Sequence, residues 1–275
     1  MGAPTDRPVS SSSIDCEAAA RLMAPLTELV ATAGSAILAV DRSRMSVAGK
    51  SDGSPVTEAD LASDRIIAAG LARLAPDIPT LSEERATQES GRFETFFLVD
   101  PLDGTKEFVA GRDEFTVNLA LVSNGTPLLG IVSAPARGLI WRGLVGRGAE
   151  RLATSGIGAA EPIRTRPFPK AGQPWIAAVS RSHGDAATEA FIDARPGAVR
   201  KTLGSAVKFA RVAEGAADIY PRLAPTSEWD VAAGHALVTA AGGKVTDPAG
   251  GSLRFGMAAD FIVPAFIAWG DPGAV

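Results

Sequence analysis

Cysteine is almost absent from the sequence: Cys16 stands alone among 275 residues, so no intrachain disulfide can form. Disulfides are typical of oxidising compartments, and their exclusion fits a reducing compartment such as the cytoplasm. The net charge is −4, so the sequence has no excess of basic residues. Proteins that bind a nucleic acid polymer use such an excess to hold its phosphates. We therefore expect a small-molecule partner, no nucleic acid polymer, and a cytoplasmic location.

Hydrophobic runs are short throughout the sequence. None approaches the roughly 20 residues that a membrane span needs, so we expect no span, although weak peripheral membrane association stays open. Residues 1–15, "MGAPTDRPVSSSSID", lack the apolar core of a signal peptide and are expected to form a disordered tail. Their start resembles a myristoylation site, but Asp6 stands where Ser or Thr is required.

The hydrophobic content is nevertheless 46%, and 275 residues suffice for one large domain or two small ones. Apolar positions recur at helical spacing in residues 16–40, with a kink expected at Pro25. A second amphipathic helix is expected between Thr57 and Pro76. Residues 115–146 contain short apolar runs separated by Asn-Gly, Pro and Gly signals, a pattern that predicts an antiparallel meander.

The second half of the sequence alternates strand-like and helix-like segments, which predicts an α/β layer. The change in character falls in the Pro-rich residues 161–174. After the tail we therefore expect an α+β subdomain in residues 16–165 and an α/β subdomain in residues 166–275. A ligand cleft between the two is the default expectation.

One stretch, "FFLVDPLDGTKEF" in residues 96–108, ends an apolar run with two acids three positions apart. In a continuing strand Asp100 and Asp103 would point to opposite faces, but Pro101 ends the strand and Gly104 permits a sharp turn. Such a turn can bring the two carboxylates together, where they repel each other unless a cation lies between them. Hard oxygen ligands of this kind suit Mg²⁺ or Mn²⁺.

Two neighbouring residues could extend this site. Leu102 could contribute its backbone carbonyl, and Thr105 could offer a hydroxyl at the start of a helix whose free N–H groups favour a phosphate oxygen. A plain turn explains the same stretch equally well when it is considered alone, because Pro, Asp and Gly are turn residues.

Three more acids lie at the ends of apolar segments: Asp60 where a helix begins, Glu83 after "TLS", and Asp230 before an apolar helix. Each has a simpler explanation, as a solvated loop residue or as a helix cap. Four acidic positions of this kind, with residues 100–103 among them, favour a cation site over four coincidences.

The combination of "DPLDGT" with "SEE" upstream and "WD" downstream resembles the inositol monophosphatase-like superfamily of Mg²⁺-dependent, lithium-sensitive phosphatases, from about residue 17 onward. The resemblance implies a layered α-β-α-β-α sandwich that binds two or three Mg²⁺ ions, with Mn²⁺ as a substitute. Asp60 and Thr105 would be the pair that activates water. The implied metal ligands are Glu83, Asp100, the Leu102 carbonyl, Asp103 and Asp230.

Within that superfamily, three segments resemble bacterial 3'(2'),5'-bisphosphate nucleotidases of the CysQ type: "DGTKEF", "VSRSHGD" and "LGSAVKFARVAEGAADIYPR". Inositol-specific members usually read Asp-Gly-Thr-x-Asn-Phe instead. Lys208 would hold a second phosphate, with Arg222 a weaker candidate, whereas Lys106 and His235 are expected to be structural. The implied substrate-binding residues are Gly104, Thr105, Ser180, His183, Gly204, Ser205, Lys208 and Asp230.

The resemblance implies hydrolysis of 3'-phosphoadenosine 5'-phosphate to AMP and phosphate in sulfate assimilation, with the phosphorylated nucleotide as the small-molecule partner. Two alternatives stay open: activity on inositol monophosphate or fructose 1,6-bisphosphate, and a catalytically silent metal-binding regulatory protein. Retention of all the expected ligands together with Asp60 and Thr105 argues against silence. Whether the chain forms a homodimer stays open as well.

Overall fold

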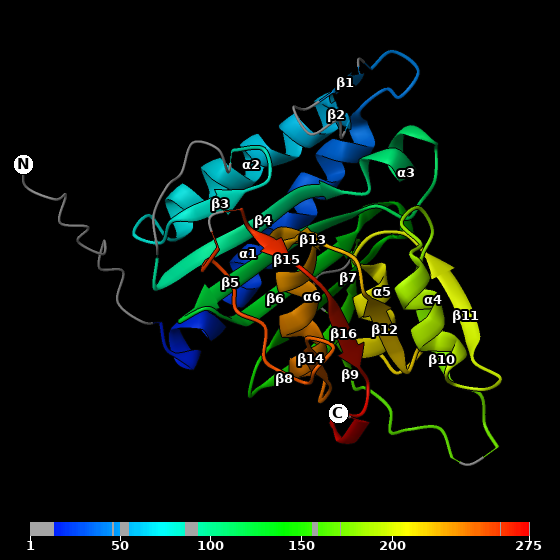
Figure 1. The fold of residues 1–275 in the computed structure, drawn as a ribbon. Coiled ribbons are helices and arrows are strands. Elements are labelled where there is room, and N and C mark those ends of the chain that lie inside the picture. Colours follow the sequence, from blue (N-terminus) through cyan, green and yellow to red (C-terminus); the bar gives the residue numbers. More distant parts are fainter. Residues whose placement is uncertain are drawn as a thin grey trace, which may run out of the picture.

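The computed structural model describes residues 14–45, 47–49, 55–85, 93–155, 159–170, 172–258 and 260–274. In these residues helices alternate with the two larger β-sheets to give five layers (Figure 1). The predicted disordered tail, residues 1–15, lies outside the described residues except for Ile14 and Asp15.

The first layer consists of α1 (Cys16–Ala39) and α2 (Glu58–Leu74). The Asp15 side chain caps α1 by accepting the Ala18 N–H, and the helix continues through Pro25, where a kink stays a prediction. Thr57 and Asp60 form a capping box that satisfies free N–H groups at the start of α2. Both helices predicted from apolar spacing are therefore confirmed.

Helix α1 is long and apolar enough to cross a membrane by length and composition alone, although the short hydrophobic runs predict no span. The core helix of a globular protein passes the same test. Eight residues of α1 are buried, and its apolar side chains share a core with α2 and one face of the larger sheet. We therefore interpret α1 as a core helix.

The second layer is a seven-stranded sheet with the order β3-β4-β5-β6-β7-β8-β9, antiparallel except between β3 and β4. The predicted meander is confirmed as β5, β6 and β7. Asn124 and Gly125 both have positive φ, which a two-residue hairpin turn of this type requires. The strands are β3 (Thr80–Ser82), β4 (Thr95–Asp103), β5 (Thr116–Ser123), β6 (Thr126–Ala134), β7 (Leu139–Leu144), β8 (Gly148–Ala153) and β9 (Glu161–Ile163).

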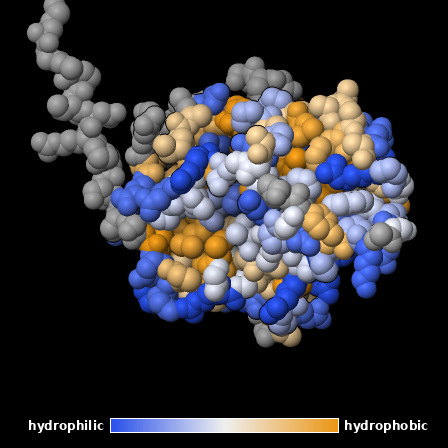
Figure 2. Space-filling view, turned by 60° about the horizontal axis from the view of Figure 1, so that its bottom comes forward, coloured by the Kyte–Doolittle hydropathy of each residue, from blue (hydrophilic) through white to orange (hydrophobic). Residues whose placement is uncertain are grey.

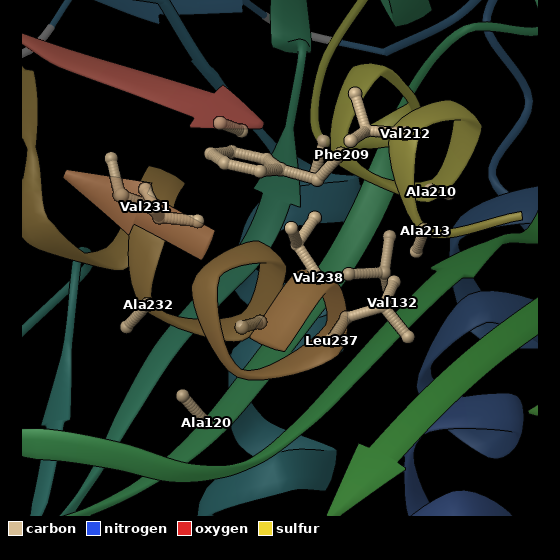
Figure 3. Close-up of a cluster of buried hydrophobic side chains, with 14 of the residues drawn as sticks. Ala120, Val132, Phe209, Ala210, Val212, Ala213, Val231, Ala232, Leu237 and Val238 are labelled. Carbon is tan, nitrogen blue, oxygen red and sulfur yellow. The ribbon is translucent and has the colours of Figure 1, made fainter. Parts of the chain in front are cut away.

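The third layer, between the two sheets, consists of α5 (Val207–Ala213) and α6 (Glu228–Ala240). Figure 3 shows part of this core, where side chains of both helices lie with Ala120 and Val132 of the seven-stranded sheet. Helix α6 approaches that sheet closely at Gly130, where an added Cβ would lie 2.1 Å from the Ala233 carbonyl oxygen. Only glycine therefore fits at this point of β6.

The fourth layer is a five-stranded sheet with the order β11-β10-β12-β16-β14. Strand β10 is parallel to β11 and β12, and β16 is antiparallel to β12 and β14. Helix α4 (Ala186–Asp193) forms the fifth layer, with Ile192 packed on the outer face of this sheet. The strands are β10 (Ile176–Ser180), β11 (Val199–Leu203), β12 (Ile219–Arg222), β14 (Lys244–Thr246) and β16 (Phe266–Trp269).

This order of layers is the predicted α-β-α-β-α sandwich. Strand β4 shows why its sequence is apolar at consecutive positions: Phe97 and Val99 join the core under α1 and α2, while Phe96 and Leu98 join the core under α5 and α6. A strand buried on both faces needs apolar side chains at every position.

The chain passes from the larger sheet to the smaller one between Ile163 and Ile176, within the Pro-rich segment. Helix α6 shares its core with both sheets, so the division at residue 165 stays a prediction. On the face seen in Figure 2, hydrophobic residues form separate islands among hydrophilic ones. The remaining short elements are β1 (Val47–Gly49), β2 (Pro55–Thr57), α3 (Thr105–Val109), η2 (Pro135–Arg137), β13 (Thr226–Ser227), β15 (Ile262–Val263) and η3 (Pro272–Ala274).

Candidate metal and phosphate site

A cavity of about 220 Å³ opens where the end of β4, the loop before α5 and the start of α6 meet. Among the predicted site residues, Asp60 alone does not line it. Those that do are Glu83, Asp100, Leu102, Asp103, Gly104, Thr105, Ser180, His183, Gly204, Ser205, Lys208 and Asp230. The structure therefore brings together residues that are up to about 150 positions apart in the sequence.

The turn at the end of β4 places its two acids in one site. The ladder with β5 is regular up to Asp100 and Asn118, then shifts before Asp103 pairs with Thr116. The Leu102 N–H donates to Asp100 Oδ1 at 3.0 Å, and Gly104 follows with a φ of 93°. Pro101 does not end the strand as expected, because β4 continues to Asp103; the irregularity in the ladder instead lets the two side chains converge, as predicted.

Asp230 completes an acidic cluster from the second half of the chain. It lies in the first turn of α6, where Thr226 Oγ1 donates to its Oδ2. One carboxylate oxygen from each of Asp100, Asp103 and Asp230 lies within 4.8 Å of the other two. This spacing is suited to shared coordination of a cation.

The cluster is electrostatically unfavourable by itself. Burial, followed by the charges of Glu83, Asp103 and Asp230, raises the pKa of Asp100 well above its usual value. Burial and the charge of Asp230 also raise the pKa of Asp103 to about 6, against the opposing charge of Lys208. Several buried carboxylates held this close fit a hard divalent cation such as Mg²⁺, which prefers oxygen ligands and offsets their charge.

Asp60 lies behind the cavity wall and reaches the site through Thr105. Its Oδ2 accepts the Thr57 N–H at 2.8 Å and the Thr57 hydroxyl at 2.6 Å, so the helix-cap interpretation is correct. Its Oδ1 accepts the Thr105 hydroxyl at 2.8 Å. One buried carboxylate thus caps α2 and orients the hydroxyl that lines the cavity.

The cavity is also lined by the basic side chains of Lys106, His183, Lys208 and Arg222, together with the buried acid Glu107. Lys208 is 3% exposed, its Nζ donates to the Ser205 carbonyl at 2.6 Å, and burial lowers its pKa to about 8. Burial and then the charges of Arg222 and Lys106 lower the pKa of His183. An anion bound here would offset this mutual repulsion.

Two expectations for single residues have different outcomes. Lys106 is expected to be structural, yet it lines the cavity. His235 is instead a core residue: its ring packs edge-on against Phe255, and burial lowers its pKa to about 4.

The loop before α5 touches the acidic cluster directly. The Ala206 N–H donates to Asp103 Oδ2 at 2.7 Å, and Ser205 Oγ donates to the Asp103 carbonyl at 2.8 Å. Ser205 has a φ of 49°, in the left-handed region that non-glycine residues rarely adopt. Gly104 is required opposite this loop, because a Cβ there would lie 2.2 Å from Ser205 Oγ.

Sequence reasoning missed the partners of the "SRSH" segment. Ser182 Oγ donates to Glu107 Oε1 at 2.5 Å, and Arg181 donates to Glu114 at 2.8 and 3.0 Å. Arg181 and Ser182 are therefore tied to glutamates, while Ser180 and His183 line the cavity. The sequence does show a glutamate before each Phe in "KEF" and "DEF", namely Glu107 and Glu114. It gives no sign that these glutamates pair with Ser182 and Arg181, which are distant in the chain.

Comparison with known sequences gives a consistent assignment. Residues 18–271 match the model of the inositol monophosphatase family. The chain is 41% identical over 243 residues to 3'(2'),5'-bisphosphate nucleotidase CysQ from Shigella flexneri, covering 87% of this chain and 96% of that protein. The protein of the same name from Salmonella typhimurium is 39% identical over 249 residues, with coverages of 89% and 98%.

Solved structures agree with the sequence matches. The crystal structure of CysQ from Bacteroides thetaiotaomicron is similar with a TM-score of 0.74 and 34% identity, covering 91% of this chain and 97% of that chain. An inositol monophosphatase from Zymomonas mobilis is similar with a TM-score of 0.72 and 25% identity, covering 94% of both chains. Sequence, fold and site geometry together lead to one conclusion: the chain belongs to the inositol monophosphatase family.

Proposed function

We propose that this chain is a Mg²⁺-dependent phosphomonoesterase that hydrolyses 3'-phosphoadenosine 5'-phosphate to AMP and phosphate. The observation that carries the proposal is that the acidic cluster and the basic side chains of Lys106, Lys208 and Arg222 line one cavity. A substrate with two phosphates fits this lining, since one phosphate would face the acids and their cation while the other would meet Lys208 and its neighbours. Relatives about 40% identical are named 3'(2'),5'-bisphosphate nucleotidase, which supports this substrate class.

The acidic side would hold two or three Mg²⁺ ions, for which Mn²⁺ could substitute. When bound, such ions lower the pKa of water and neutralise a leaving oxygen. Their proposed ligands are Glu83, Asp100, the Leu102 carbonyl, Asp103 and Asp230.

Thr105 and Asp60 would orient and deprotonate the attacking water. Because the Thr105 hydroxyl donates to Asp60 Oδ1 at 2.8 Å, its oxygen is left to accept a hydrogen bond from water in the cavity. A proton taken from that water can then move through Thr105 to the carboxylate of Asp60, as in general base catalysis. Thr57 holds Asp60 in place for this transfer.

The remaining cavity residues would hold the nucleotide. Ser180 and His183 come from one loop, in which the His183 N–H donates to Ser180 Oγ at 3.2 Å. Gly204 and Ser205 come from the loop that positions Lys208, the proposed partner of the second phosphate. Gly104 gives the backbone room to approach the phosphate at the acidic side.

This reaction would remove the nucleotide by-product of sulfate assimilation, a cytoplasmic role. Cationic side chains in the same cavity as the acids favour a bisphosphate over inositol monophosphate, which has no second phosphate to place beside them. The Thr105–Asp60 hydrogen bond argues against a catalytically silent protein, because a metal-binding role alone does not require it.

A panel of phosphate esters tests the proposal. Phosphate release should be measured with the adenosine bisphosphate, inositol 1-phosphate and fructose 1,6-bisphosphate, each with Mg²⁺ and with excess EDTA. We expect the highest kcat/KM for the adenosine bisphosphate and no turnover in EDTA. A preference for the inositol ester would replace the substrate assignment, and a folded, metal-binding chain that hydrolyses no ester would leave a regulatory protein.

A further inference from the structure

Glu114 lies in the loop between α3 and β5, outside the cavity wall, and links the two halves of the chain. Its side chain is 9% exposed and accepts hydrogen bonds from Arg137 at 3.1 Å and from Arg181 at 2.8 and 3.0 Å. Burial raises the pKa of Glu114, but the hydrogen bond and charge of Arg181 outweigh burial, so the pKa lies below its usual value. Glu114 is therefore a buried, ionised carboxylate that binds one arginine from each half of the chain.

The same residue also holds the loop before α5. Its Oε2 accepts the Gly204 N–H at 2.9 Å, and its backbone carbonyl lies 2.8 Å from Ser205 Oγ, whose single hydroxyl proton it shares with the Asp103 carbonyl. The fit is tight, because a Cβ on Gly204 would lie 2.5 Å from the Glu114 carbonyl oxygen. Side chain and main chain of one residue thus hold two consecutive loop residues.

The loop of residues 204–206 requires stabilising contacts because of the backbone conformation of Ser205. Ser205 adopts a left-handed backbone conformation, which costs an L-residue on the order of 1–2 kcal/mol and persists only where surrounding contacts impose it. From this conformation the loop aligns Ala206 N–H with Asp103 Oδ2 and offers the Ser205 carbonyl to Lys208 Nζ. One loop therefore sets the relative position of the acidic cluster and of the buried lysine.

We propose that Glu114 is a positioning residue for the reaction. Without touching substrate, it keeps the loop of residues 204–206 in the conformation that orients Asp103 for the cation and Lys208 for the second phosphate. The proposal rests on the proposed function for the identity of the substrate and for the binding of a cation by the acids, and Mn²⁺ binding can be measured without any substrate.

Glu214 offers a matched control. Its side chain is 7% exposed and pairs with two arginines, Arg151 and Arg211, and with one neutral donor, Trp141 Nε1. It follows the far end of α5 and does not line the cavity. Neutralising it should cost stability in the same way but leave the site untouched.

The experiment compares wild type with Glu114→Gln and Glu214→Gln. Three quantities are measured: the urea midpoint of unfolding, Mn²⁺ affinity of the substrate-free protein by calorimetry, and kcat/KM for the adenosine bisphosphate. Both variants should lose stability. Only Glu114→Gln should lose about tenfold or more in Mn²⁺ affinity and in kcat/KM, since tenfold corresponds to about 1.4 kcal/mol, the scale of one hydrogen bond to a charged group.

A second variant at the same position tests the proposal if Glu114→Gln does not fold. Glu114→Asp keeps the charge that both arginines need, but its side chain is one methylene shorter; the flexible arginine side chains can follow the carboxylate, whereas the Gly204 backbone N–H cannot. We expect it to fold and to show the same loss of Mn²⁺ affinity. Wild-type Mn²⁺ affinity in Glu114→Asp, or equal effects of Glu114→Gln and Glu214→Gln on Mn²⁺ affinity, would overturn the positioning role.

The two proposals fail in different ways. If wild type does not hydrolyse the bisphosphate, yet Mn²⁺ affinity falls only in the Glu114 variants, the proposed substrate is wrong and the positioning role stands. If wild type hydrolyses it and the Glu114 variants match Glu214→Gln in every measurement, the proposed function stands and the positioning role is wrong.

Discussion

Replacing Lys208 by methionine should impair hydrolysis of a bisphosphate far more than hydrolysis of a monophosphate. Lys208 is 3% exposed, and its Nζ lies 5.2 Å from the centre of the Tyr220 ring. Methionine is unbranched and flexible, so it can keep the packing against Tyr220 while it removes the charge. The substitution therefore tests charge rather than volume.

The expected loss in kcat/KM follows from the contact between the buried Lys208 amine and the second phosphate. A charge-assisted hydrogen bond to a phosphate is worth about 1.5–3 kcal/mol, or roughly ten- to a hundredfold in kcat/KM. A monophosphate does not make this contact, and loses only the help that Lys208 gives by lowering the pKa of Asp103. The ratio of kcat/KM for the two substrates should accordingly fall by roughly ten- to a hundredfold.

The same contact predicts a pH dependence. Burial lowers the pKa of Lys208 to about 8, so the amine is charged below that pH and loses its proton as the pH rises through it. Wild type should lose its preference for the bisphosphate above about pH 8, whereas Lys208→Met should show no such loss.

Initial rates of phosphate release at saturating Mg²⁺ measure both effects, with the adenosine bisphosphate and inositol 1-phosphate as substrates. Lys106→Met is the control, because Lys106 lines the same cavity but is exposed, where solvent weakens a charge. Equal slowing of both substrates by Lys208→Met would refute the assignment of Lys208 to the second phosphate.

Three further predictions concern the metal cluster and the core. Asp100→Asn should nearly abolish turnover, because Asp100 interacts electrostatically with Glu83, Asp103 and Asp230; full turnover in this variant or in excess EDTA would contradict the proposed metal dependence. Millimolar Li⁺ should inhibit, and rates equal to those in NaCl at the same ionic strength would exclude a lithium-sensitive site. Burial lowers the pKa of His235 from 6.5 to about 4, so the folded state binds fewer protons than the unfolded state between these values. Wild type should lose roughly 3 kcal/mol of stability as the pH falls through that window, and a His235→Asn variant with the same pH dependence in urea unfolding would contradict this.

Much of the fold was accessible from local pattern. Apolar spacing located α1 and α2, and the Asn124–Gly125 pair marked a hairpin, because these features depend on residues close in the chain. The acids that end apolar segments were found for the same reason. Their number favoured a shared cation site, but the resemblance to a family was needed to name its ligands, since no local rule places Asp230 beside Asp100.

The missing parts depend on contacts between distant residues. Glu114 and Arg181 are 67 positions apart, and each looks like a solvated charge in its own segment. The φ of 49° at Ser205 is imposed by the surrounding contacts, because serine has no preference for it. The exposure of Lys106 to the cavity likewise depends on which way the short helix α3 faces.

The absence of a side chain at Gly130 has a consequence for how sequence variation in this chain should be interpreted. Gly130 touches α6 at Ala233, one helical turn after Asp230. Any larger residue must lift the helix from the sheet, and the lift is transmitted along a rigid helix to the carboxylate at its start. In a saturation mutagenesis screen, this glycine within a hydrophobic layer should therefore be as intolerant of change as a metal ligand. A score based on distance from the cavity would class it as neutral.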